Sequence, residues 1–252
     1  MAERYLESKS DGIYFQAAEM TALPVAVARR LLRVAVDRAR GNLTGISFEH
    51  IEALRGLAAR RRGNGRSHIP DLEAIRSFDQ IRLARFSREP EPYSRRQCIL
   101  VHAPGSFKLP WGSSLVVLKR YTREDFQRKE RYNGRRHGLI NWEKVPKPLK
   151  LRSWRAGDRY HPRGRKGAKK LKTLFQERKI AVWERPRWPV IAAVSAEPAE
   201  ARAEPGEREV VVWARGFGPS VEFAADDNSH IVVDITEYAS GGDGEIGIES
   251  GT

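Results

Sequence analysis

Residues 151–171 have the sequence LRSWRAGDRYHPRGRKGAKKL, and this stretch indicates more about the fold than any other. Apolar and polar residues alternate from Leu149 to Arg152, and a strand is predicted there that ends at Trp154. Three glycines that permit tight turns follow, at Gly157, Gly164 and Gly167. A helix is predicted next, from about 169 to 179. Its apolar face is expected to consist of Leu171, Leu174 and Phe175, which have helical spacing.

The same stretch has the parts of a phosphate site. Glycine-rich turns let backbone N–H groups approach an anion, and a helix N-terminus behind two lysines attracts negative charge. Asp158 follows a glycine and precedes an arginine. That position is more typical of a residue that shapes a turn or orients an arginine than of a catalytic carboxylate. The aromatic residues among the bases are expected mostly to pack in the core.

The charge of the whole chain indicates a polyanionic partner. Its 252 residues include 46 Lys and Arg against 32 Asp and Glu, a net charge of +14. Fourteen of these bases and only three acids lie between Lys150 and Arg187, whereas residues 188–252 are acidic. Because a solvated surface usually interleaves both signs, the concentrated positive segment favours contact with nucleic acid. The acidic end is expected to face away from that partner or to stay mobile.

Upstream, two helices are predicted between residues 20 and 62. Pro24 suits the first turn of one helix and Gly41 its end, while Ser47 is a suitable N-cap for the other. The second helix ends in a basic, glycine-containing stretch, 60–66, which is expected to form a flexible loop.

Period-two patterns predict strands on both sides of the basic stretch. They lie at 74–78 and 81–86 as a hairpin, and then at 97–101, 115–121, 139–142, 149–154, 190–194, 209–213, 220–223 and 231–235. Residues 123–137 are expected to be a basic linker or a helix stabilised by charge pairs. Residues 195–208 have the composition of an acidic surface loop.

These patterns together predict an α+β fold. We expect a small helical domain with a short hairpin over 1–88 and a strand-rich basic connector over 89–148. A mixed α/β C-terminal domain is expected over 149–238. The Gly, Ser and acidic residues of 239–252 predict a disordered tail.

Several classes of protein are disfavoured by the composition. The apolar runs are far shorter than the ~20 residues of a membrane helix, and residues 1–15 lack a secretory pattern, so a cytoplasmic protein without a membrane partner is expected. A single cysteine, Cys98, allows no internal disulfide. The six histidines have no metal-ligand spacing and no nucleophile elbow occurs, so no metal site and no catalytic residue are expected.

Two parts of the chain resemble a known family. One part resembles the C-terminal domain of the tRNA(Ile)-lysidine synthetases. The residues that carry this resemblance are Gly157-Asp158-Arg159, Pro162, Gly164, Gly167, Lys169-Lys170-Leu171, Phe175, Lys179-Ile180, Arg185 and Pro189. The other part resembles the helical middle domain of the same family, through Ala22-Leu23-Pro24, Arg29-Arg30-Leu31-Leu32 and Phe48-Glu49-His50-Ile51. The resemblance covers most of residues 15–235.

The resemblance implies the tRNA-recognising portion of an ATP-dependent ligase that joins lysine to the wobble cytidine of isoleucine tRNA. In the family, an N-terminal PP-loop domain with a Ser-Gly-Gly-x-Asp-Ser loop holds ATP and performs the chemistry. Residues 240–244 match only the beginning of such a loop. We therefore expect this chain to be inactive alone and to bind no cofactor. A PP-loop domain, in cis or in trans, is expected to supply ATP and magnesium.

The expected partner is isoleucine tRNA, bound through its acceptor stem or body. The expected tRNA contacts are Arg152, Arg155, Arg159, Arg163, Arg165, Lys166, Lys169, Lys170, Lys172, Lys179 and Arg185. The turns that present them, as an anion nest, are expected at Gly157, Asp158, Gly164 and Gly167. The alternative is a free-standing basic RNA-binding or ribosome-associated protein without catalytic activity, which the charge alone would equally allow.

Overall fold

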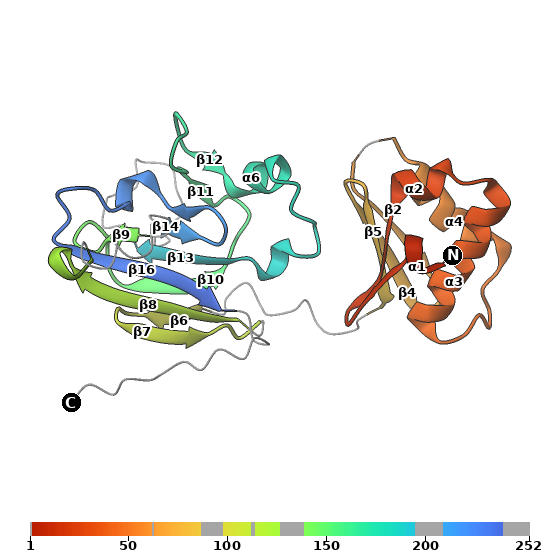
Figure 1. Ribbon diagram of the computed structural model, residues 1–252, viewed down its shortest axis with the longest axis horizontal. Coiled ribbons are helices and arrows are strands. Elements are labelled where there is room, and N and C mark those ends of the chain that lie inside the picture. Colours follow the sequence, from red (N-terminus) through yellow and green to blue (C-terminus); the bar gives the residue numbers. More distant parts are fainter. Residues whose placement is uncertain are drawn as a thin grey trace, which may run out of the picture. The chain divides into compact units, whose positions relative to one another are not determined.

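The computed structural model describes residues 2–61, 63–86, 98–111, 114–126, 139–194 and 209–238. They form two compact units (Figure 1). The first unit is Met1–Pro90 with Arg178–Arg185, and the second unit is Glu91–Glu177 with Pro186–Thr252. The expectations for the 195–208 loop, the 239–252 tail and most of the 123–137 linker lie outside the described residues.

In the first unit, helices cover one face of a five-stranded antiparallel sheet with the order β1-β2-β5-β4-β3 (Figure 1). Its elements are α1 (Ala2–Tyr5), β1 (Glu7–Lys9), β2 (Gly12–Gln16), α2 (Ala17–Ala22), α3 (Val25–Arg40), α4 (Phe48–Ala59), β3 (Gly65–Ile69), β4 (Leu72–Ser77) and β5 (Gln80–Arg85). The expected helices and hairpin are present. They belong to a larger sheet than the sequence indicated.

The ends of α3 and α4 lie where the sequence predicted them. Pro24 is the N-cap residue of α3, and Gly41 ends that helix with a left-handed φ of 88°, which favours glycine. Ser47 and His50 form a capping box at the start of α4. The buried apolar faces of both helices, which include Leu32 and Leu54, pack in one core with the sheet.

Two expectations for the first unit need correction. No helix was predicted before Pro24, yet α2 precedes it, and the extended backbone of Leu23 separates α2 from α3. The expected loop 60–66 ends early, since Gly65 and Arg66 already belong to strand β3 and pair with β4. Pairing between strands, rather than local composition, sets these residues' conformation.

The second unit consists of two larger antiparallel sheets and a small hairpin (Figure 1). The sheet orders are β15-β14-β13-β10-β6, β7-β8-β16-β9 and β11-β12. The elements are β6 (Cys98–Val101), β7 (Gly105–Lys108), β8 (Leu115–Thr122), β9 (Leu139–Asn141), β10 (Leu149–Ser153), β11 (Arg159–Tyr160), β12 (Lys169–Lys170), α6 (Leu171–Glu177), β13 (Pro189–Val194), β14 (Glu209–Ala214), β15 (Gly218–Pro219) and β16 (Ile231–Tyr238).

The two larger sheets contribute to one apolar core. Leu151 and Ile191 come from one sheet, and Leu118 and Val233 from the other. Strands of the expected connector, 89–148, therefore share their sheets and core with strands beyond 149. The α+β class predicted from the sequence is confirmed.

Three details of the second unit differ from the sequence patterns. Residues 169–170 are a strand paired with 159–160, so the helix is shorter than expected and runs only over Leu171–Glu177. Val221–Phe223 is a 3-10 helix rather than a strand.

In the part of the chain that the structure describes, no helix has both the length and the apolar character needed to cross a membrane.

Candidate nucleic-acid interface

The predicted phosphate site is a short hairpin, residues 159–170, which we call the basic hairpin. Arg159 pairs with Lys170 and Tyr160 with Lys169. The Leu171 N–H donates to the Asp158 carbonyl at 2.9 Å, so the first residue of α6 closes the hairpin at its base. Gly157 and Gly164 have left-handed φ angles of 102° and 80°, which explains glycine at these two turns.

Tyr160 anchors the basic hairpin to β15 and to the residue that precedes it. Its side chain is 1% exposed, and its hydroxyl donates to the Gly218 carbonyl at 2.7 Å, with the carbonyl oxygens of Phe217 and Pro219 at 3.0 Å. The Val221 N–H also donates to the His161 carbonyl at 2.9 Å. The hairpin is therefore held in place before any ligand binds.

Removing the anchoring hydroxyl should destabilise the second unit. We expect Tyr160→Phe to lower the free energy of unfolding by about 1–3 kcal/mol, because buried and partly buried carbonyl groups lose their donor. Urea denaturation measures the change. Tyr238→Phe is the matched control, since Tyr238 is 41% exposed, and it should leave the urea midpoint unchanged. Equal midpoints for both variants would contradict the anchoring role.

Helix α6 supports the hairpin through an aromatic cluster. The Phe175 ring contacts the rings of Trp154 and Trp188, with centroids 5.0 and 5.4 Å away. Leu171, Leu174 and Phe175 are all buried, as the helical spacing predicted. Of the aromatic residues among the bases that were expected mostly to pack in the core, Tyr160 is buried, whereas Trp154, Trp183 and Trp188 are half-buried.

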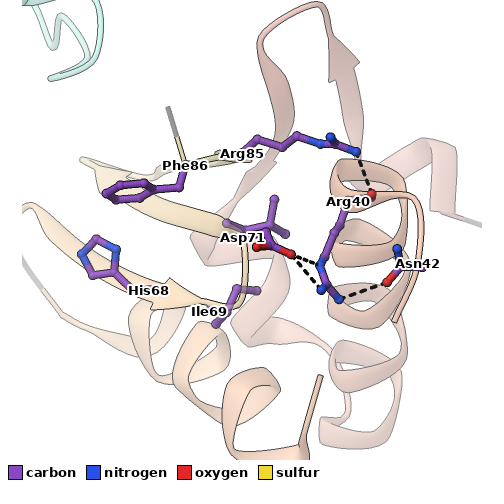
Figure 2. Close-up of a pocket in the computed structure, with 8 residues that line it drawn as sticks. Arg40, Asn42, His68, Ile69, Asp71, Arg85 and Phe86 are labelled. Carbon is purple, nitrogen blue, oxygen red and sulfur yellow. Dashed lines mark hydrogen bonds and ion pairs between the residues drawn. The ribbon is translucent and has the colours of Figure 1, made fainter. Parts of the chain in front are cut away.

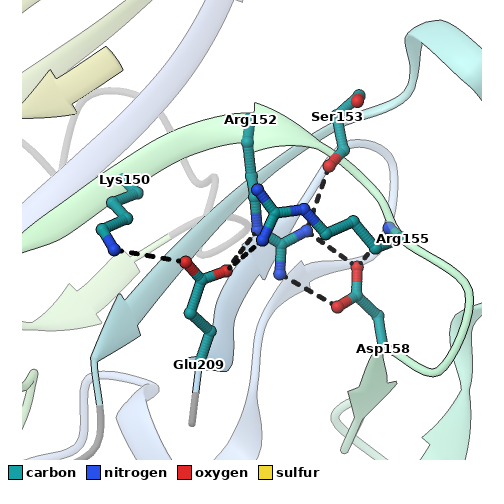
Figure 3. A network of polar contacts seen from close by, with 6 residues as sticks. All are labelled: Lys150, Arg152, Ser153, Arg155, Asp158 and Glu209. Atoms are coloured by element: carbon teal, nitrogen blue, oxygen red, sulfur yellow. Dashed lines mark hydrogen bonds and ion pairs between the residues drawn. The ribbon is translucent and has the colours of Figure 1, made fainter. Parts of the chain in front are cut away.

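A buried network of charges lies under the base of the basic hairpin (Figure 3). Arg152 on β10 is 1% exposed, and its Nη1 and Nη2 each donate to one oxygen of Asp158 at 2.9 Å. Its Nε donates to Glu209 of β14 at 2.7 Å. Arg155 and Lys150 also approach Glu209, at 3.2 and 3.4 Å. Asp158 thus orients an arginine, as its position in the sequence predicted.

Asp158 also shapes the turn that leads into the hairpin, because its carboxylate accepts the backbone N–H of Arg155 at 2.6 Å. Burial alone would lower the pKa of Arg152, but hydrogen bonds and charges from Asp158 and Glu209 outweigh it and raise that pKa. Burial would likewise raise the pKa of Glu209, yet the Arg152 charge lowers it. Both shifts favour the charged forms of Arg152 and Glu209.

Two residues predicted to contact tRNA are buried instead. Arg152 is committed to the two carboxylates, and Arg185 is 7% exposed and donates to the Ile180 carbonyl at 2.8 Å. Burial lowers the pKa of Arg185. Neither guanidinium reaches the surface, so we correct the prediction that they contact tRNA and give them structural roles. Glu209, which the sequence analysis did not single out, lies 57 residues from Arg152 and has no local signal.

Most of the other predicted contacts lie on the surface. The exposed bases of the hairpin and α6 are Arg159, Arg163, Arg165, Lys166, Lys170 and Lys172. Lys169 is half-buried and pairs with Glu177 at 2.5 Å, and Arg165 pairs with the same carboxylate at 3.2 Å. Arg155 is half-buried in the network, and Lys179 is exposed with a φ of 54°. The structure thus brings six exposed cations together on one small hairpin and the helix that follows it.

Two family models match the chain. Residues 15–82 match the TilS substrate binding domain, and residues 149–196 match the TilS substrate C-terminal domain. The second match contains the basic hairpin and most of the buried network. Both segments that resembled tRNA(Ile)-lysidine synthetases in the sequence are therefore confirmed as domains of that kind.

Curated relatives agree with these matches. A tRNA(Ile)-lysidine synthase of Solibacter usitatus is 36% identical over 229 residues, which are 89% of this chain and 47% of the relative. One of Geobacter sulfurreducens is 31% identical, covering 62% of this chain and 32% of the relative. One of Geobacillus kaustophilus is 30% identical, covering 86% and 42%. The chain thus spans less than half the length of these three relatives.

A solved structure titled "Crystal structure of TILS C-terminal domain" aligns with 58% of this chain and 98% of its own. The sequence identity is 23% and the TM-score 0.43.

Proposed function

We propose that this chain, which contains the substrate-binding and C-terminal domains of the tRNA(Ile)-lysidine synthetase family, is the tRNA-recognising portion of such a ligase. The substrate is proposed to be isoleucine tRNA, bound through its acceptor stem or body. Lysine is joined to the wobble cytidine of that tRNA at the expense of ATP. The two matched domains and the relatives' names support this assignment.

The observation that carries the proposal is the cluster of exposed cations on the basic hairpin. Lysine and arginine side chains that reach phosphates supply most of the affinity for nucleic acid and are insensitive to base sequence. An RNA stem presents phosphates and 2′-hydroxyls across its minor groove, which suits a small protruding hairpin. The proposed contacts on the second unit are Arg159, Arg163, Arg165, Lys166, Lys169, Lys170 and Lys172. Lys179, which belongs to the first unit, is a further proposed contact.

The buried network has a positioning role in this proposal. Arg152 connects β10 to Asp158, which fixes the turn at Arg155 and starts the basic hairpin. Tyr160 holds the other side of the hairpin base. Because the hairpin is fixed before binding, little conformational entropy is lost when its cations meet phosphates.

The chemical step is proposed to lie in a PP-loop domain, joined in cis or supplied in trans, that holds ATP and magnesium. The matched residues cover 47% of the Solibacter relative, which leaves room for such a domain in that protein. We assign no catalytic residue to this chain and propose that it does not attach lysine by itself. The alternative of a free-standing basic RNA-binding protein is not favoured, because both matched domains come from the same family.

The proposal predicts that charge at the basic hairpin matters more than charge elsewhere. We expect Lys166→Ala with Lys170→Ala to weaken tRNA binding roughly 2- to 30-fold, since two exposed ion pairs worth ~0.2–1 kcal/mol each are lost. Fluorescence anisotropy with labelled isoleucine tRNA measures the affinity.

The charge-matched control is Lys119→Ala with Arg120→Ala, because both residues are exposed on β8. The control should bind nearly as tightly as the unchanged chain. Equal losses in the two double variants would mean that net charge, and not the hairpin, attracts tRNA. Unchanged thermal melting of both variants shows that the fold is intact.

A further inference from the structure

A pocket of about 630 Å³ opens at one end of the sheet in the first unit (Figure 2). Three separate segments form it: the end of α3, the turn between β3 and β4, and the end of β5. Its lining residues are Arg40, Asn42, His68, Ile69, Asp71, Leu72, Arg85 and Phe86. Its volume lies within the ~300–1,000 Å³ typical of small-molecule sites.

One wall of the pocket is aromatic. The rings of His68 and Phe86 meet edge to face, with centroids 5.8 Å apart, and Figure 2 shows both at the same end of the pocket. Phe86 is 53% exposed, although a large apolar side chain gains by burial. Phe48 is similarly exposed, at 56%, but there the guanidinium of Arg29 lies over the ring at 4.7 Å. An exposed ring in a pocket offers a surface for stacking.

The opposite wall is polar and fixed. Arg40 donates from Nε to Asp71 at 2.9 Å and from Nη1 to Asn42 at 3.0 Å, and Figure 2 shows these contacts side by side. Arg85 donates from Nη2 to the Arg40 carbonyl at 2.9 Å, at the end of α3. Its Nε also donates to the Ala39 carbonyl at 3.5 Å, and the two bonds together use only part of the five donors of a guanidinium. The Asp71 carboxylate only accepts hydrogen bonds, so the wall combines a cation with an acceptor.

We infer that this pocket binds one unpaired nucleotide of the RNA. The base stacks on Phe86 and His68, its amino or imino groups face the Asp71 carboxylate, and a neighbouring phosphate lies at Arg85. This combination of aromatic surface, fixed hydrogen-bonding groups and cation is how proteins bind unpaired bases. The inference rests on the proposed function. It extends that function from the phosphates of a stem to a single-stranded part of the same substrate.

A short single-stranded RNA that carries one 2-aminopurine tests the pocket, with the duplex of the same sequence as its counterpart. Stacking on an aromatic ring quenches 2-aminopurine fluorescence, so the unchanged chain should quench the single strand more than the duplex. Phe86→Ala should remove this quenching and weaken single-strand binding roughly 5- to 150-fold, the range of base stacking on one aromatic residue. His68→Ala should give a smaller loss.

Phe48→Ala is the matched control, since it removes an equally exposed phenylalanine of the same unit outside the pocket. It should quench and bind like the unchanged chain. Unchanged melting of both phenylalanine variants keeps the comparison valid. Equal single-strand affinity in Phe86→Ala and Phe48→Ala would overturn the inference. The same result is expected if the pocket binds a protein partner instead of a nucleotide.

The two proposals fail in different ways. If the unchanged chain bound neither tRNA nor the short RNAs, the proposed function itself would be wrong. If it bound tRNA and lost affinity in the Lys166 and Lys170 variant, but Phe86→Ala changed nothing, only the nucleotide pocket would be wrong.

Discussion

Asp158→Ala should destabilise the second unit by about 3–5 kcal/mol, because it leaves the buried Arg152 with an incomplete set of partners. Asp158 is 10% exposed, and its carboxylate accepts hydrogen bonds from both terminal nitrogens of Arg152. It also accepts the Arg155 N–H, which would lose its partner in the same variant. Loss of this size corresponds to a fall of roughly 6–20 °C in Tm.

Differential scanning calorimetry measures the change, with Glu177→Ala as the control. Glu177 also pairs with two bases, but it does so on the surface, where solvent screens the charges. Its removal should leave the Tm nearly unchanged. If both variants melted alike, the network around Arg152 would not hold the base of the hairpin.

The network also predicts sensitivity to acid. The pKa of Glu209 is lowered in the folded chain, so its ionised form stabilises the fold. That contribution is present above the unfolded pKa, about 4.3, and is lost as the pH falls through the lower folded value. The difference in unfolding free energy between the unchanged chain and Glu209→Gln should therefore shrink toward low pH.

Raising the salt concentration from about 50 mM to about 200 mM should weaken tRNA binding roughly 10³-fold, the second large effect that we expect. Six exposed cations lie on the hairpin and the start of α6. Each phosphate that a cation neutralises contributes about −0.7 to −0.9 to the slope of log affinity against log salt. If all six reach phosphates, the slope is about −4 to −5.

Filter binding over a salt series gives the slope directly. Changing Arg163, Arg165, Lys166 and Lys170 to alanine should reduce the slope's magnitude by about 3, because four phosphate contacts are lost. An affinity that does not respond to salt, or an unchanged slope in the fourfold variant, would show that other groups bind the RNA.

Which basic residues are exposed could not be predicted from their spacing. Arg152, Arg155, Arg159 and Arg163 follow one another at intervals of three or four residues. Arg152 is nevertheless buried, whereas Arg159 and Arg163 are exposed. A long guanidinium side chain is stable in the interior only where partners satisfy its donors. One partner, Glu209, comes from a strand 57 residues away. No local sequence pattern indicates that Arg152 and Glu209 come into contact.

The pocket of the first unit was missed for the same reason. Arg40, Asp71 and Phe86 are unremarkable in the sequence, at the end of a helix, in a turn and after a strand. Only the pairing of β3, β4 and β5 beneath α3 brings them together. In addition, β1 and β2 fall in a segment without a strong period, so the full extent of the sheet was not predicted.

The sequence by itself determined the elements whose signals are local. These are the capped helices α3 and α4, the buried face of α6, most strands, the concentration of positive charge and the orienting role of Asp158. Tertiary structure alone decided which arginines are buried and which residues share a pocket. Periodicity records whether a position faces inward, because backbone geometry repeats along one segment. Periodicity does not predict which distant side chain contacts that position, because the contact depends on how separate segments pair and pack.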